Sequence, residues 1–346
     1  MCGVYLESSE KFKPNKKHRN THKKKIGKNK MKKTILPILI ATLSLVNLNS
    51  ANAQIYINEL YFNPAGTDAP NEYIELRGTP GLSVGTGNYL LFLEGDNNPT
   101  STTPGGRAGD IQGLFNLSSK TFGSNGHMVL RQFSSPYTVN GNASTYTGTS
   151  AGWGGLGFNT SASAAGDVEN ISFTAMIVNI GSGSAPTWGG QLDTNNDGTL
   201  ELPSGWSILD SIGVGDTGPA DRLYGAVNFS SAPNTSTVTT NGGLLQYLAW
   251  TEIEYLARVG TSTGNTLLDW AVADVGFTGT VVDSIVNGPD TTSGVQESFN
   301  IAAGTRIVDT LGSANPVPEP SAQALLGLGM VALVAVRALR RGRSDS

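Results

Sequence analysis

The residues best suited to chemistry form one short run, Asp193-Thr194-Asn195-Asn196-Asp197-Gly198-Thr199-Leu200-Glu201. Oxygen-bearing side chains at alternate positions, with a glycine where the chain turns sharply, are typical of a loop that binds Ca²⁺. We expect five ligands: the side chains of Asp193, Asn195 and Asp197, the carbonyl of Thr199 and the carboxylate of Glu201. The sequence therefore predicts a structural calcium site that orders this loop.

This loop departs from the EF-hand pattern in two ways. Ser204 stands at the twelfth position, where an EF-hand has a bidentate Glu, and no flanking helices are evident. The run is closer to the shorter Asp/Asn-rich calcium loops of secreted proteins. The alternative is a solvated Asn/Asp/Gly turn that holds no metal.

Three carboxylates near the start of the body, Glu59, Glu72 and Glu75, are candidates for acid–base work on a sugar. Glu72 and Glu75 are three residues apart, so in a strand they point to opposite faces of the sheet. The interpretation we favour is that all three are structural groups on the sheet surface or at strand ends.

Other residues with chemical potential have plainer interpretations. His127 follows the turn Gly123–Gly126 and has no serine or cysteine nucleophile nearby, so an exposed turn histidine is favoured over a general base. Five tryptophans and two tyrosines could stack on sugar rings, although aromatic residues more often fill a core. They are Trp153, Trp188, Trp206, Trp250, Trp270, Tyr137 and Tyr146. Trp153, in a Gly-rich loop, is the main candidate for glycan contact.

Charge is distributed very unevenly along the 346 residues. Residues 1–53 contain 12 Lys and Arg, whereas residues 54–316 contain 7 basic and 23 acidic side chains, a formal net charge of −16. Such a body repels phosphates, which argues against nucleic-acid binding. Its sequence contains no cysteine and a single histidine, which excludes a disulfide framework and a multi-histidine metal site.

The N-terminal part has the layout of an export signal. Residues 31–53 begin with Met31 and two lysines, continue with about a dozen apolar residues, and end in Ala51-Asn52-Ala53, an A-x-A cleavage site. The apolar stretch is short for a span of roughly 30 Å. We interpret 31–53 as a signal peptide and residues 1–30 as a basic upstream extension that precedes the true start at Met31. The alternative for 1–30 is a nucleic-acid-binding arm.

The C-terminal part has three pieces in a fixed order. Val317-Pro318-Glu319-Pro320 is followed by an apolar segment from about Ala322 to Val336, and then by the cluster Arg337, Arg340 and Arg341. The order over residues 317–343 resembles the PEP-CTERM sorting signal of Gram-negative bacteria. The resemblance implies processing by an exosortase near Pro-Glu-Pro, transient anchoring in the inner membrane, and release or attachment at the cell surface, often with exopolysaccharide. The alternative is a plain membrane anchor.

The pattern of residues 54–316 predicts β structure. Short apolar runs at 55–61, 73–76, 89–93, 128–130, 171–180, 206–212 and 281–283 are separated by Gly-, Asn- and Pro-rich turns. Leu244–Val259 is the best helix candidate but also reads as two strands. We predict an all-β body over 54–316, an antiparallel β-sandwich with long Gly/Ser/Asn-rich loops, followed by one C-terminal hydrophobic helix.

Residues 57–76 carry a second resemblance. Ile57-Asn58-Glu59-Leu60, then Asn63-Pro64 and Glu72-Tyr73-Ile74-Glu75-Leu76, look like the opening of a lamin tail domain. Ile208–Gly213, Leu256–Val259 and Leu268-Asp269-Trp270 fit its later strands more loosely. The resemblance implies an immunoglobulin-like sandwich, here enlarged by long insertions.

These observations lead to two expectations from different classes. The first is a non-enzymatic protein of the cell surface or extracellular matrix, calcium-stabilised and associated with polysaccharide. The second is a secreted hydrolase, a phosphoesterase, nuclease or glycosidase acting on extracellular polymer.

Overall fold

The computed structural model describes residues 54–64, 66–103, 105–157, 167–170, 172–215, 220–231, 238–248, 253–276, 280–284 and 307–315; for residues 274, 276 and 280–284 it describes the backbone alone. By its contacts the chain divides after Ala51, and all described residues lie in the unit that begins at Asn52. The predicted signal peptide, with Ala51 and Ala53, lies outside the described residues. So do Trp250, the sorting-signal residues 317–320, 337, 340 and 341, and the predicted C-terminal helix.

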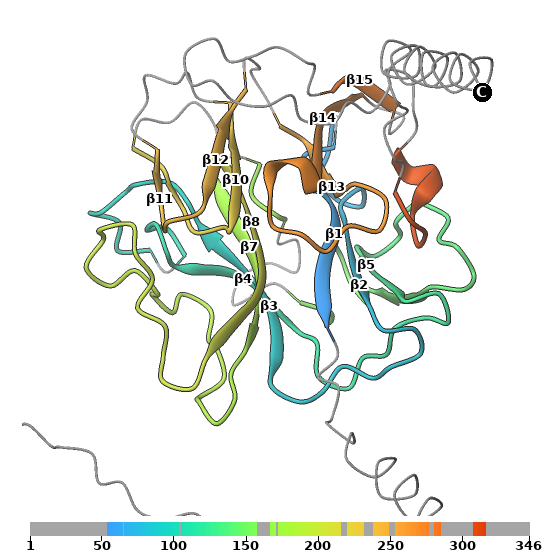
Figure 1. Cartoon of the computed structure of the whole chain (residues 1–346), viewed down its shortest axis with the longest axis horizontal. Helices are drawn as coiled ribbons and strands as arrows, with labels where there is room; N and C mark the ends of the chain where they lie inside the picture. Colours follow the sequence, from blue (N-terminus) through green and yellow to red (C-terminus); the bar gives the residue numbers. More distant parts are fainter. Residues whose placement is uncertain are drawn as a thin grey trace, which may run out of the picture. The chain divides into compact units, whose positions relative to one another are not determined.

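The described residues are built from strands, with two short 3₁₀ turns (Figure 1). The strands are β1 (Ile55–Tyr61), β2 (Tyr73–Gly78), β3 (Asn88–Glu94), β4 (Ile111–Asn116), β5 (His127–Arg131), β6 (Ser144–Thr147), β7 (Phe173–Asn179), β8 (Ser207–Gly215), β9 (Arg222–Leu223), β10 (Val227–Ser230), β11 (Thr239–Thr240), β12 (Leu244–Tyr247), β13 (Tyr255–Arg258), β14 (Trp270–Gly276) and β15 (Thr280–Ser284). The turns are η1 (Leu267–Asp269) and η2 (Ile307–Thr310). The all-β prediction is confirmed, and the described residues of the 244–259 stretch contain two strands, β12 and β13, rather than a helix.

Two large sheets contain most of these strands. The first has the order β15-β14-β13-β1-β2-β5-β6 and the second the order β12-β10-β8-β7-β3-β4, while β9 and β11 form a separate pair. The inward side chains of both sheets meet in one core, which includes Ile57, Leu76 and Leu256 from the first sheet and Phe92 and Phe173 from the second. The β-branched and aromatic content of these runs suits a pleated surface buried on both faces.

The prediction of antiparallel sheets is wrong in part. Strand β10 is parallel to both β8 and β12, and β6 is parallel to β5. Ile212, Val227 and Leu244 lie opposite one another along three parallel strands, as in the turns of a β-solenoid. The connections between these strands are long enough to return the chain to the same end of the sheet, which a tight hairpin turn cannot do.

Each sheet also has a covered outer face. On the first sheet, Tyr61, Tyr73 and Tyr255 pack against Ile307, Val308 and Leu311 from the C-terminal end of the described chain. On the second sheet, Leu91, Leu93 and Met176 form a cluster with Leu192 and Tyr224. Strand residues that a two-layer scheme would leave in solvent are therefore buried here.

Candidate functional site

The predicted calcium loop lies beyond the outer face of the second sheet and turns around Asp193. Asp193 is buried, and its Oδ1 accepts from the backbone N–H of Asp197 at 3.0 Å. Its Oδ2 accepts from the N–H of Gly198 at 2.9 Å and from the Tyr224 hydroxyl at 2.9 Å. Gly198 has φ +87°, and a side chain there would collide with Thr239. The glycine is therefore required both by the turn and by the close approach of its neighbour.

The structure brings together the three carboxylates of this loop. Asp193, Asp197 and Glu201 each offer an oxygen within 4.8 Å of the others, a set of hard oxygen ligands that fits Ca²⁺. Hydrogen bonds from the Thr199 backbone lower the pKa of Asp197 most, which keeps it ionised. Asn195, the remaining side chain of the predicted ligand set, lies in the same turn: its Oδ1 accepts from Asp197 N–H at 3.0 Å and its Nδ2 donates to Asp197 Oδ2 at 3.0 Å.

A second acidic group of the same kind was not predicted from the sequence. Glu94, at the end of β3, lies with Asp96 and Glu169 so that one oxygen of each falls within 4.8 Å of the others. Burial first, and then the charge of Glu169, raises the pKa of Glu94 to about 9. Asn196 Nδ2 donates to Asn97 Oδ1 at 3.2 Å, which joins this turn to the calcium loop. The sequence signal was limited to the Glu94-Gly95-Asp96 turn, because Glu169 is distant along the chain.

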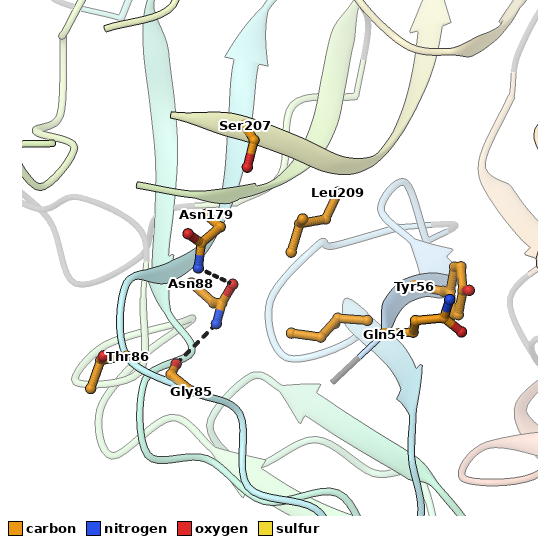
Figure 2. Close-up of a pocket in the computed structure, with 9 residues that line it drawn as sticks. Gln54, Tyr56, Gly85, Thr86, Asn88, Asn179, Ser207 and Leu209 are labelled. Carbon is orange, nitrogen blue, oxygen red and sulfur yellow. Dashed lines mark hydrogen bonds between the residues drawn. The ribbon is translucent and has the colours of Figure 1, made fainter. Parts of the chain in front are cut away.

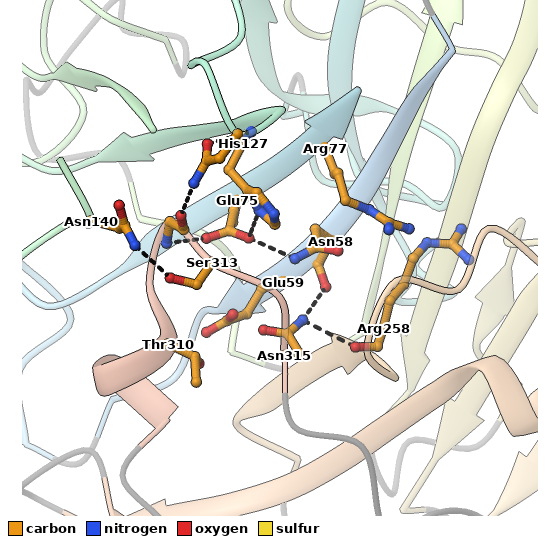
Figure 3. A network of polar contacts seen from close by, with 12 residues as sticks. Asn58, Glu59, Glu75, Arg77, His127, Asn140, Arg258, Thr310, Ser313 and Asn315 are labelled. Atoms are coloured by element: carbon orange, nitrogen blue, oxygen red, sulfur yellow. Dashed lines mark hydrogen bonds and ion pairs between the residues drawn. The ribbon is translucent and has the colours of Figure 1, made fainter. Parts of the chain in front are cut away.

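Glu59 and Glu75 are buried, contrary to the prediction of sheet-surface groups. They are cross-strand partners on β1 and β2, on the face covered by residues 307–315 (Figure 3). Glu75 Oε1 accepts from Asn58 Nδ2 at 2.6 Å and lies 2.7 Å from His127 Nδ1. Burial, and then the charge of Glu75, raises the pKa of Glu59 well above its ordinary value. Neither carboxylate is open to a polymer in this structure.

His127 is also buried, so the prediction of an exposed turn histidine is wrong. Gly126 ends the turn as predicted, but β5 begins at His127 itself and pairs with β2. The imidazole thereby lies on the same covered face as Glu75. In the antiparallel pairing of β5 with β2, His127 lies opposite Arg77, two residues along from Val129, which lies opposite Glu75. The sequence alone could not place His127 beside Glu75, because that placement needs the strand pairing to be known.

Glu72 and Trp153 form a structural contact on the inner side of the first sheet. The Trp153 indole Nε1 donates to Glu72 Oε2 at 2.8 Å, and Gln132 Nε2 donates to the same oxygen at 2.7 Å. Burial is the main reason that the pKa of Glu72 is raised well above its ordinary value. Trp153 fills the core, as the favoured interpretation of the aromatic residues predicts, and its ring is fully buried against Phe115, so the alternative of glycan contact is wrong for this residue. Glu72 and Glu75 do point to opposite sides, as predicted.

An ion pair joins the two sheets through the core. Arg258 Nη2 donates to Asp210 Oδ1 at 2.7 Å and to Oδ2 at 2.8 Å, and its Nε donates to the Ile57 carbonyl at 2.8 Å. The guanidinium lies 4.4 Å from the centroid of the Trp270 ring. Asp210, Arg258 and Trp270 come from the three later segments that resemble a lamin tail domain. The resemblance therefore falls on residues that contact one another.

An open groove of about 510 Å³ lies beside the first residues of β1 (Figure 2). Its polar lining is Gln54, Thr86, Asn88, Asn179 and Ser207, with Tyr56 and Leu209 beside them. These lining side chains carry no charge. Leu209 is 40% exposed, so an apolar surface lies next to the amides. The Asn179 Nδ2 donates to Asn88 Oδ1 at 3.0 Å and fixes the pair.

A comparison with protein families assigns a sorting role to the C-terminal segment. Residues 316–341 match the PEP-CTERM protein-sorting motif. The motif implies that the chain is exported in a bacterium, sorted at a membrane, and processed by an exosortase-type enzyme. The lamin tail resemblance of the body has no matching family model. Neither curated proteins nor solved structures gave a match to the chain. Among the described residues, no helix is long and apolar enough to cross a membrane.

Proposed function

We propose that this protein is a non-enzymatic component of the cell surface or extracellular matrix of a Gram-negative bacterium. The observation that carries the proposal is the PEP-CTERM sorting motif at 316–341, joined to an acidic all-β body. The PEP-CTERM tag addresses the body to the envelope, and the body acts there by binding. An immunoglobulin-like framework of the lamin tail type belongs to this proposal and is supported by the inter-sheet contact of Asp210 with Arg258.

The ligand that the groove beside β1 suits best is a neutral polysaccharide. Its volume lies within the usual range of roughly 300–1,000 Å³ for small-molecule sites. Amide and hydroxyl groups such as those of Asn88 and Ser207 can exchange hydrogen bonds with sugar hydroxyls. Leu209 offers an apolar patch for the C–H face of a ring. The uncharged lining within a strongly acidic body favours neutral over anionic sugars.

Binding is tested with exported protein whose first residue is Gln54, assayed against the host's own extracellular polysaccharide and against neutral and uronate-containing glucans. Leu209→Asp places a charge in the groove and should lower affinity for the neutral polymer at least tenfold. Leu244→Asp is the matched control, because Leu244 is 46% exposed on β12 and does not line the groove. Equal affinities for wild type and Leu209→Asp would contradict this placement.

We also propose that Asp193, Asp197 and Glu201 hold a structural Ca²⁺. Ligand binding to the folded state alone should raise the melting temperature by several degrees in 1 mM Ca²⁺ relative to EDTA. Asp197→Asn, at an exposed ligand, should abolish this shift, whereas Asp309→Asn, at an exposed aspartate outside the loop, should keep it. A shift that survives Asp197→Asn but disappears in Asp96→Asn would move the ion to the group around Glu94.

The non-enzymatic part of the proposal is supported by the burial of Glu59, Glu72 and Glu75. Incubation of residues 54–316 with glycoside and phosphodiester substrates should give no turnover above buffer. Turnover that Glu75→Gln abolishes, with the fold unchanged by circular dichroism, would favour a secreted hydrolase instead.

A further inference from the structure

The last described segment of the chain, Ile307–Asn315, is bound to the outer face of the first sheet; we call it the C-terminal strap. Ile307, Val308 and Leu311 are buried against the tyrosines of β1, β2 and β13. The strap is therefore part of the folded body, although it follows every described strand along the chain.

Polar contacts fix the strap along its length (Figure 3). The Gly312 N–H donates to Glu75 Oε2, and Asn125 Nδ2 donates to the Gly312 carbonyl at 2.7 Å. At the strap's end, Asn315 Nδ2 donates to the carbonyls of Asn58 at 3.2 Å and Arg258 at 3.0 Å. Asn315 is 4% exposed, so the chain is held by the body up to this residue.

The sorting motif begins at the next residue. The match starts at residue 316, and Pro318-Glu319-Pro320 follows within five residues of Asn315. Four residues span at most roughly 14 Å when fully extended. A domain of this size has a radius of gyration of roughly 18 Å. An enzyme that binds an extended segment on both sides of its cleavage point would therefore meet the body.

We propose that the docked strap shields the sorting motif, and that the processing enzyme acts on chains whose strap is released from the sheet. A released strap adds the residues from Ile307 to Asn315 to the free segment and moves the body away from the motif. The rate of processing then depends on the equilibrium between the docked and the released strap.

The first test weakens the strap in the full-length chain, co-expressed with the host's processing enzyme and carrying an epitope after Ser346. Gly312→Ala is disfavoured twice, because Gly312 has φ +83° and an added Cβ would lie 2.9 Å from Ala143 Cβ and Val139 Cγ1. Gly141→Ala is the control, because a Cβ added at Gly141 would have no neighbouring atom within 4 Å. Loss of the epitope should be at least threefold faster for Gly312→Ala and unchanged for Gly141→Ala.

The second test locks the strap and does not depend on a destabilised variant. Asn140 Nδ2 donates to Ser313 Oγ at 3.0 Å, so Asn140→Cys with Ser313→Cys places two thiols across the seam. The native chain has a single cysteine, Cys2, upstream of the predicted signal peptide. Processing of the oxidised double variant should fall at least fivefold and return on reduction, while neither single variant should be processed more slowly than wild type.

Two results would overturn the proposal. One is wild-type processing of the double variant Asn140→Cys with Ser313→Cys after mass spectrometry has shown that its introduced disulfide is formed. The other is slower processing of a folded Gly312→Ala chain, which would mean that the docked strap presents the motif. The proposed surface function and polysaccharide binding are tested on processed protein, whereas the strap is tested by the rate of processing. A negative result in the binding assays would therefore leave the strap proposal standing.

Discussion

Arg258 is buried in the core, where a charge is stable only with a partner. It has three kinds of neighbour: the carboxylate of Asp210, the carbonyl of Ile57 and the ring of Trp270. Burial raises the pKa of Asp210 while the charge of Arg258 opposes that rise. Such a pair adds little net stability compared with apolar residues, but the loss of one partner is costly.

Arg258→Met should therefore lower the free energy of unfolding by about 3–5 kcal/mol, because Asp210 is left buried without a cation. The double variant Arg258→Met with Asp210→Asn should recover part of that loss, since no uncompensated carboxylate remains. Urea denaturation of residues 54–316 measures both values. A double variant as unstable as the sum of its single variants would show that the pair is not coupled.

Glu59 should make the protein less stable as pH rises. Its pKa is raised in the folded state, so between the unfolded value near 4.5 and the higher folded value the native state binds more protons than the unfolded state. The free energy of unfolding then falls as pH rises through that window. Glu59→Gln keeps an oxygen for the Tyr73 hydroxyl and should flatten this part of the profile, as measured by melting temperature from pH 4 to 8. If the melting temperatures of wild type and Glu59→Gln changed equally with pH, Glu59 would not be the source of this pH dependence.

Strand β1 is the element that connects the body's features. It lies in the middle of the seven-stranded sheet, between β13 and β2, and begins at Ile55, two residues after the predicted cleavage site. A break in register between Ile57 and Glu59 sets Asn58 against Glu75. Strand β1 thus contributes to the inter-sheet core, pairs Glu59 with Glu75, and binds the C-terminal strap through the Asn58 carbonyl.

Central and edge strands should respond differently to the same substitution. Leu256→Ala on β13 removes a fully buried side chain from the inter-sheet core and should cost about 2–5 kcal/mol. Leu244→Ala on β12, at the edge of the other sheet and 46% exposed, should change stability by less than about 0.5 kcal/mol. Equal losses in chemical denaturation would mean that β12 is more deeply packed than this arrangement implies.

We expect the two ends of the chain to be separated from the body. The basic N-terminal region and the sorting motif flank a segment of net charge −16. The extracellular protein should therefore start at Gln54 and end within the sorting motif, which intact-mass spectrometry of culture supernatant and surface fractions can measure. Recovery of a peptide covering Arg337–Arg343 from surface protein would indicate a plain anchor instead.

The local elements could be predicted from the sequence, and their pairing could not. Alternation in Ile55-Tyr56-Ile57 and in Tyr73-Ile74-Glu75-Leu76 marks strands directly, because strand periodicity is local. The parallel register of β8, β10 and β12 depends on long connections that carry no local signal. For the same reason the burial of His127 and the contact of Trp153 with Glu72 were missed: their partners, Glu75 and Glu72, are brought to them by distant pairing. The carboxylate group around Asp193 could be predicted because its members are close in sequence, and the Glu94 group could not because Glu169 is distant along the chain.

The position of β1 also has a consequence for the timing of folding. Its register partners include Ala257 and Tyr255, and its Asn58 carbonyl accepts from Asn315, so its native neighbours are synthesised long after it. Pairings this distant along the chain form slowly, because much chain entropy is lost before any contact is gained. The sheet cannot be completed while the second half of the chain is still on the ribosome. The domain can therefore close only after the chain has been synthesised as far as Asn315.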